Sequence, residues 1–195
     1  LKLITPKMEN VLYSVAHQDG KFIIVTNKDN CRNFKIMITD VNQSSVDNWK
    51  EFLPYDQDIY IKGVDELQNH LAVLYKYNGT NKIRIIKKIN DKYDFDNMYN
   101  IELGDKDKDT NERSIGLCSL DIYDTDRVWI SHNSLDTPLT LYEFNLNTQN
   151  IEVLREKHIP KFNKDDYNSK RIYATSHDGT KVPMSIVYNK NMFKH

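Results

Sequence analysis

Cysteine is scarce in this 195-residue sequence, which contains only Cys31 and Cys118. The two lie far apart, with no CxxC pair and no histidine at the spacing of a metal ligand. A disulfide framework and a zinc knuckle are therefore both disfavoured. We expect two buried thiols in a reducing compartment instead.

An excess of one charge sign is also lacking. Lysine and arginine number 27 and aspartate and glutamate 28, which leaves a formal net charge of −1 and no electrostatic footprint for nucleic acid. Apolar runs stay short of the ~18 residues that cross a membrane. Residues 1–6 lack both an initiator methionine and the apolar core of a signal peptide. We expect no nucleic-acid partner, no membrane partner, and arbitrary cuts at both ends of the chain.

No catalytic constellation is recognisable, because the chain has no Gly-x-Ser-x-Gly nucleophile elbow. Ser176, His177 and Asp178 are the residue types of a triad, but neighbours in a strand or turn point in different directions and cannot align for catalysis. The mixed-charge run at residues 104–109 is interpreted as a solvated loop and not as a metal site. We therefore predict no catalytic, cofactor-binding or metal-binding residue in this chain.

Short strands are what the sequence does contain. Segments rich in β-branched and aromatic residues alternate with clusters of Asn, Asp and Gly, which is typical of antiparallel strands joined by tight turns. Turns are predicted at residues 18–20, 77–79 and 123–126, where positive φ or an Asx turn can reverse the chain. Strands are predicted at residues 12–17, 22–26, 34–39, 59–64, 71–77, 83–88, 128–132, 139–145 and 151–154.

These strands repeat with a period of roughly 50 residues, at which the blades of a β-propeller occur. Three four-stranded antiparallel blades are predicted, at about residues 10–56, 57–104 and 113–158, so the fold class is all-β and a partial β-propeller. A blade buries its faces only against neighbouring blades, and propellers have at least about four of them. Three blades leave two open faces, so we expect the chain to be unstable by itself.

The pattern changes at residue 165. Residues 170–188 predict a β-hairpin whose strands are joined by Asp178 and Gly179, since an Asp-Gly turn is a strong hairpin signal. Pro183 has no N–H to donate, so it is expected at an edge or at a position without a ladder hydrogen bond.

Three phrases stand out in residues 128–188: Ser134-Leu135-Asp136-Thr137-Pro138, Tyr142-Glu143 and Asp178-Gly179-Thr180-Lys181-Val182-Pro183. Together they resemble the oligopeptidase B branch of the prolyl oligopeptidase family. In that family the first two phrases belong to the last propeller blade and the third opens the α/β-hydrolase domain. Two departures occur in loops, where relatives often have glycine and this chain has Gln149 and Lys161.

The resemblance implies a division into C-terminal propeller blades at residues 1–158, an inter-domain connector at 159–169 and the truncated start of a hydrolase domain at 170–195. Residues 158–171 are then expected to act as a hinge, because few apolar side chains anchor them. Their charged side chains are expected either to bridge the two domains or to be solvated.

The resemblance also implies a parent protein that is a cytoplasmic serine endopeptidase. It would cleave short peptides after Arg or Lys, with the propeller restricting access to the hydrolase domain. The triad would lie outside this chain, so the chain alone is expected to be inactive. Two alternatives stay open: a propeller scaffold for protein interaction without peptidase activity, and a prolyl-specific or acylaminoacyl relative.

Overall fold

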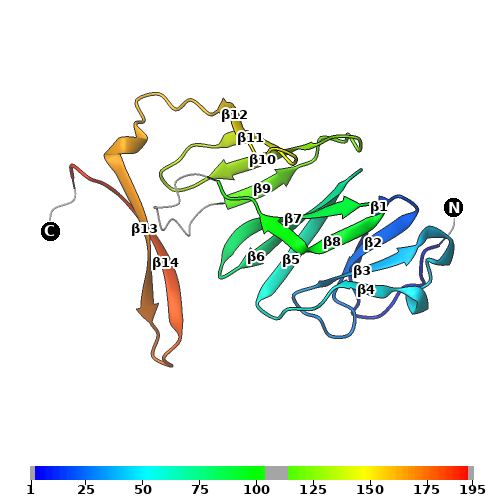
Figure 1. Ribbon diagram of the computed structural model, residues 1–195. Helices are drawn as coiled ribbons and strands as arrows, with labels where there is room; N and C mark the ends of the chain where they lie inside the picture. Colours follow the sequence, from blue (N-terminus) through cyan, green and yellow to red (C-terminus); the bar gives the residue numbers. More distant parts are fainter. Residues whose placement is uncertain (1–2, 104–113, 193–195) are drawn as a thin grey trace. The chain divides into compact units, whose positions relative to one another are not determined.

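The computed structural model describes residues 3–103 and 114–192, and its strands form three four-stranded antiparallel sheets and one two-stranded hairpin (Figure 1). In each sheet the strands are hydrogen-bonded in the order of the sequence. The predicted loop at residues 104–109 lies outside the described residues. No helix in the described part of the chain is long and apolar enough to cross a membrane.

The three sheets follow the predicted blades. The first has strands β1 (Tyr13–Gln18), β2 (Lys21–Thr26), β3 (Lys35–Asp40) and β4 (Lys50–Leu53). The second has β5 (Ile59–Leu67), β6 (His70–Tyr77), β7 (Thr80–Ile89) and β8 (Lys92–Asn100). The third has β9 (Ser114–Cys118), β10 (Arg127–Asn133), β11 (Thr140–Asn145) and β12 (Ile151–Glu156).

The hairpin consists of β13 (Tyr167–Thr175) and β14 (Lys181–Asn189), and three short 3-10 turns complete the described elements. Two of them, η1 (Val41–Gln43) and η2 (Val46–Asn48), lie between β3 and β4. The third, η3 (Lys164–Asp166), directly precedes β13. The hairpin therefore begins before residue 170, where the sequence pattern predicts its start, and Pro183 lies opposite Tyr173 in an isolated strand pair.

The described residues divide into two compact units. The first contains residues 3–78, 82–101 and 119–126, and therefore most of β1 to β8. The second contains residues 79–81, 102–103, 114–118 and 127–192, and therefore the third blade and the hairpin.

The alternation of side chains along the strands explains how the first two blades pack. Ile23 and Val25 of β2 point to one face of the sheet, and Ile24 between them points to the other. The first face joins Leu71, Ile86 and other residues of the second blade in one apolar cluster. On the other face, Ile24 packs with Met37 and Trp49, and Ile4 and Met8 of the N-terminal segment cover them.

A buried glutamine joins the same two blades. Gln18 is 1% exposed, and its Nε2 donates to the carbonyls of Leu67 and, at 3.1 Å, of His70. Its Oε1 accepts a hydrogen bond of 2.5 Å from the hydroxyl of Tyr93. Burial raises the pKa of Tyr93 to about 12, so the phenol stays a neutral donor. Both ends of the amide are therefore satisfied within the core, as a buried polar group requires.

The predicted turns at residues 18–20 and 77–79 have positive φ as expected, whereas none of residues 123–126 has a positive φ. Asn78 and Gly79, between β6 and β7, have φ of 48° and 78°, which is the pattern of a type I′ turn. Gln149 and Lys161 have φ of 60° and 62°, although neither is glycine. Both residues therefore hold a left-handed backbone with a side chain present, which costs roughly 1 kcal/mol each.

The cysteines correct one prediction in part. Both thiols are free, and Cys31 is buried as expected. Cys118, at the end of β9, is only half-buried. It belongs to the terminal strand of its sheet, where a neighbouring strand covers one side alone.

Candidate functional site

The residue types of a triad at Ser176, His177 and Asp178 lie in the loop between β13 and β14. Ser176 Oγ is 3.3 Å from His177 Nδ1. The Asp178 carboxylate instead accepts the backbone N–H of Thr180 at 3.0 Å, and this bond holds the pKa of Asp178 below its ordinary value. Gly179, with φ of 84°, closes the loop by donating its N–H to the Ser176 carbonyl at 2.9 Å. The carboxylate serves the turn, and a triad would require it to orient the imidazole.

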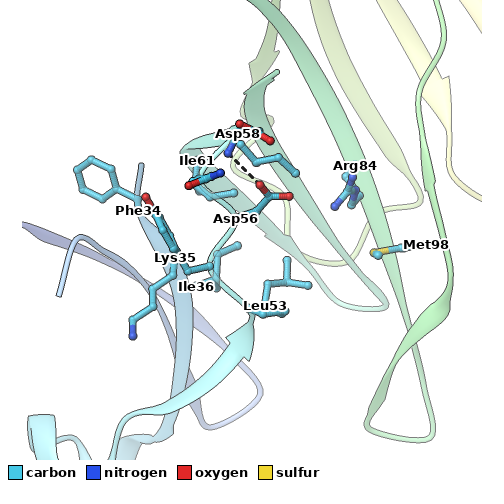
Figure 2. A pocket seen from close by; sticks show the side chains of 13 residues that line it. Phe34, Lys35, Ile36, Leu53, Asp56, Asp58, Ile61, Arg84 and Met98 are labelled. Atoms are coloured by element: carbon cyan, nitrogen blue, oxygen red, sulfur yellow. Dashed lines mark hydrogen bonds between the residues drawn. The ribbon is translucent and has the colours of Figure 1, made fainter. Parts of the chain in front are cut away.

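A pocket of about 470 Å³ lies in the first unit, between residues of the first two blades (Figure 2). Its apolar lining includes Ile36, Leu53 and Met98, and its polar lining includes Arg84, Asp56 and Asp58. Asp56 accepts the backbone N–H of Asp58 at 2.9 Å, which shapes the loop at the rim.

Arg84 is held in this pocket by an aromatic neighbour. Its guanidinium lies 4.9 Å from the centroid of the Tyr75 ring, and its Nη2 is 3.4 Å from the Tyr75 hydroxyl. Tyr75 is buried and donates to Asn100 at 3.0 Å. The pocket can therefore present one positioned cation over an apolar floor. Nothing in the sequence pattern signals this pocket, because its lining comes from both blades.

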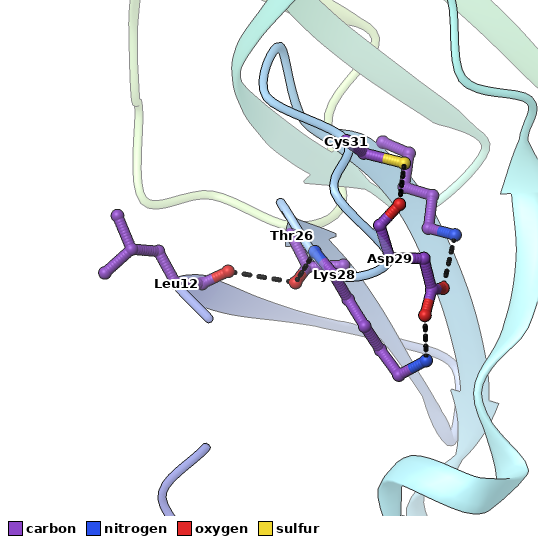
Figure 3. A network of polar contacts seen from close by, with 6 residues as sticks. Leu12, Thr26, Lys28, Asp29 and Cys31 are labelled. Carbon is purple, nitrogen blue, oxygen red and sulfur yellow. Dashed lines mark hydrogen bonds and ion pairs between the residues drawn. The ribbon is translucent and has the colours of Figure 1, made fainter. Parts of the chain in front are cut away.

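A polar network fixes one wall of the pocket (Figure 3). The Asp29 carboxylate accepts hydrogen bonds from Lys28 at 2.6 Å and from Lys35 at 2.9 Å, and these bonds lower the pKa of Asp29. The Cys31 thiol lies 3.8 Å from the Asp29 carbonyl, within the reach of a weak donor. The network holds the loop before β3, where Asp29 and Phe34 both have positive φ. Holding this loop is a structural role, and it explains why the network is present.

A second polar cluster lies in the loop between β10 and β11 of the third blade. The Asp136 Oδ1 accepts the hydroxyls of Ser134 at 2.6 Å and Thr137 at 3.2 Å. The Asp136 Oδ2 accepts the hydroxyl of Ser169 in β13 at 2.7 Å. Burial pushes the pKa of Asp136 upward, but these hydrogen bonds outweigh burial and hold the pKa below its ordinary value. Asp136 thus ties the third blade to the hairpin as a carboxylate.

Apolar side chains are exposed on the hairpin to an unusual extent. Five of them are at least 36% exposed, and β12 has exposed apolar side chains as well. Surfaces of this kind commonly pack against further protein. The hairpin residues are Ile172, Tyr173, Val182, Met184 and Val187.

The described residues contain no group of three or more His, Cys, Asp or Glu side chains arranged to hold a metal ion. The family described as "Prolyl oligopeptidase, N-terminal beta-propeller domain" matches residues 1–157. This chain belongs to that family. The match covers all three four-stranded sheets, so these are blades of its propeller.

Known proteins resemble the chain over nearly its whole length. Dipeptidyl aminopeptidase BI of Pseudoxanthomonas mexicana is 27% identical over 191 residues, which are 97% of this chain and 25% of that protein. Oligopeptidase B from Trypanosoma brucei superimposes with a TM-score of 0.86 at 20% identity, over 97% of this chain and 27% of that one.

A third comparison is with a prolyl endopeptidase structure, described in terms of a role for inter-domain dynamics in catalysis and specificity. It superimposes with a TM-score of 0.76 at 22% identity, over 96% of this chain and 26% of that one. At these identities the two superpositions establish the fold. The chain spans about a quarter of the length of the relatives that it matches.

Proposed function

We propose that this chain is part of the access-restricting propeller of a serine oligopeptidase that cleaves short peptides after Arg or Lys. The observation that carries the proposal is the order of two features along the sequence, a propeller and then a hairpin. A propeller-family match ends at residue 157, and a hairpin with exposed apolar side chains follows it at Tyr167–Asn189. Exposed apolar side chains that gather on one hairpin are commonly buried against further protein, and so they support a domain that follows the propeller.

The hairpin is then the start of the hydrolase domain, and the proposed boundaries are propeller blades at residues 1–158, a connector at 159–169 and hydrolase residues at 170–195. The exposed side chains of Val182 and Met184 support this assignment, because strands at the beginning of a larger sheet need an apolar cover. We place the working protein in the cytoplasm, where its two free thiols would stay reduced.

The proposed chemistry is acyl transfer by residues outside this chain. A serine hydroxyl attacks the peptide carbonyl, a histidine takes and returns the proton, an aspartate orients the histidine, and backbone N–H groups bind the oxyanion. This chain contributes exclusion: a propeller above the active site admits short, unfolded peptides, rejects folded proteins and keeps bulk water out.

Chromogenic peptides test the proposal on the full-length protein. We expect hydrolysis of substrates that end in Arg or Lys, and inhibition by a serine-directed reagent. Substrates that end in Pro, acylated amino acids and dipeptidyl substrates form the comparison panel. The last is included because one relative is named a dipeptidyl aminopeptidase.

The outcomes separate the candidate functions. Preference for any comparison substrate would contradict the Arg or Lys specificity, but it would still support a peptidase activity. If none of the substrates is hydrolysed, the alternative of a propeller scaffold for protein interaction is favoured. The 195-residue chain assayed alone serves as the control, and serine-inhibitor-sensitive turnover by it would contradict the placement of the triad.

A further inference from the structure

The connector between the third blade and the hairpin is anchored more firmly than its sequence predicts. Asn163 Oδ1 accepts the backbone N–H of Asp165 at 3.1 Å, and Lys190, just after β14, donates its backbone N–H to the Asp166 carbonyl at 2.8 Å. Phe162 stacks on Tyr167 with ring centroids 5.3 Å apart. The second half of the predicted hinge therefore moves with the hairpin.

The freedom that remains is confined to residues 158–161. On the blade side, the Lys157 N–H donates to the Leu139 carbonyl at 2.8 Å and continues the pairing of β11 with β12. All four residues between Lys157 and Phe162 are exposed. Lys161 also has a positive φ of 62°. Within it, the Phe162 N–H donates to the Ile159 carbonyl at 3.2 Å and the ring of Pro160 fixes its own φ, but beyond this exposed turn few contacts oppose rotation of the backbone.

A hydrogen bond between side chains bypasses this segment. The bond from Ser169 to Asp136 joins β13 to the third blade across 33 residues of sequence. Ser169 is 7% exposed and Asp136 is half-buried, so competing water reaches the hydroxyl side of this bond only poorly. A hydrogen bond to a charged acceptor is about twice as strong as one between neutral groups.

The two oxygens of Asp136 have different tasks. Oδ1 accepts from Ser134 and Thr137, which belong to the same loop, and so it shapes the loop. Oδ2 accepts from Ser169 and so constrains the hairpin relative to the blade. Ser134 and Ser169 are thus two serines on one carboxylate, one local and one across the connector.

We infer that Asp136 and Ser169 form a latch that sets the angle between the third blade and the hairpin, with residues 158–161 as the hinge that the latch restrains. The inference rests on the proposed function, because the angle then controls how far the propeller and hydrolase domains separate. Asp136 and Ser169 are positioning residues that act on substrate admission. Opening the latch favours entry of longer peptides.

The test compares Ser169→Ala with Ser134→Ala in the full-length protein. Each variant removes one hydroxyl from the same carboxylate, and only the first removes the bond across the connector. Ser169→Thr, which keeps a hydroxyl, is the rescue variant. Thermal unfolding of each variant verifies that it is folded.

Limited trypsin digestion is the first measurement, because Lys157 and Lys161 are exposed and trypsin cleaves after them, at the two ends of the proposed hinge. We expect cleavage at these two sites to be about tenfold faster in Ser169→Ala than in the unaltered protein. Ser134→Ala is expected to stay within about twofold, and Ser169→Thr to return towards the unaltered rate. Equal cleavage rates in Ser169→Ala and Ser134→Ala would overturn the latch.

The second measurement is the ratio of kcat/KM for a peptide of about 30 residues to that for a short chromogenic peptide. We expect Ser169→Ala to raise this ratio severalfold and Ser134→Ala to leave it unchanged. A purely structural bond would lower both rates together, and an unchanged ratio in Ser169→Ala would contradict the role in admission. Absence of peptidase activity in the unaltered protein would overturn the proposed function, whereas the digestion would still test the latch.

Discussion

The joint between the first two blades differs from the joint between the third blade and the hairpin. The first two blades are joined by an apolar cluster that includes Ile23 and Leu71, both 0% exposed, and by the hydrogen bonds of the buried Gln18. Between the third blade and the hairpin, the bond from Ser169 to Asp136 is prominent, and apolar side chains of the hairpin remain exposed. We call the first joint the firm seam, because a large buried cluster is rigid. We call the second joint the adjustable seam, because a few polar bonds can open.

The contrast has a functional meaning. Rigid blade contacts preserve the shape of a propeller, which is held together only by contacts between neighbours. A joint between domains has to move if substrates pass through it. The proposed role in substrate admission would use this combination of one firm and one adjustable seam.

The largest expected effect is on the firm seam. Leu71→Ala removes a fully buried side chain from the cluster between the blades and should destabilise the first unit by about 2–5 kcal/mol. Urea unfolding followed by the fluorescence of Trp49, in a Trp129→Phe background, reports on this unit, because the chain has two tryptophans, one in each unit. Leu12→Ala, at a side chain of the same unit that is 64% exposed, should change stability by less than about 0.5 kcal/mol. Similar costs for both changes would refute the contrast.

Removing the polar centre of that seam should have a smaller effect. Gln18→Leu keeps the volume but strips hydrogen-bond partners from Tyr93 and two carbonyls, at a cost of about 1–3 kcal/mol. Tyr93→Phe should cost less in the Gln18→Leu background than in the unaltered chain, because the bond is already lost. The double-mutant cycle in urea measures this coupling, and strict additivity would show that the two groups do not interact.

The firm seam should also weaken in mild acid. Burial lowers the pKa of His70, whose Nδ1 is buried without a hydrogen-bond partner. Between the lowered pKa of the folded state and the ordinary histidine pKa of 6.5, the unfolded chain binds more protons, so stability falls as the pH drops below 6.5. Urea midpoints of the first unit from pH 8 to pH 5 measure the slope. His70→Phe should flatten it, and an unchanged slope would assign the effect to another group.

The smallest effect concerns a turn in the second unit. Gln149→Gly relieves the left-handed backbone between β11 and β12 and should raise stability by up to about 1 kcal/mol. Thr148→Gly, at the preceding residue, should lower it slightly, since no positive φ is relieved there. Unfolding followed through Trp129 compares the two variants. A loss of stability in both would mean that the Gln149 side chain contributes more than its backbone costs.

Local sequence patterns predicted most of the strands and turns, and the exceptions have physical causes. β8 has polar residues at many positions because most of its side chains face solvent, so its alternation is weak. β4 has only four residues, and β9 is interrupted by Gly116. These strands exist because neighbouring strands offer them hydrogen bonds, which is a tertiary effect.

The candidate sites show the same limit. The sequence pattern argued against a triad at Ser176, His177 and Asp178 on geometric grounds, and in the structure the Asp178 carboxylate accepts the N–H of Thr180 in the turn. The pocket beside Arg84 could not be predicted, because its residues meet only when two blades pack. The phrase from Ser134 to Pro138 stood out as a family resemblance, but nothing in it predicted that Asp136 would reach Ser169.

The sequence by itself determined the all-β class, the three-blade repeat and the change of pattern before the hairpin. These properties follow from alternation, turn residues and spacing, all of which act over a few neighbouring residues. Tertiary structure alone decided which seam is firm and which is held by a carboxylate. Burial and hydrogen-bond partnership depend on groups that are distant in sequence, such as Gln18 with Tyr93 and Asp136 with Ser169, and only the folded chain brings them together.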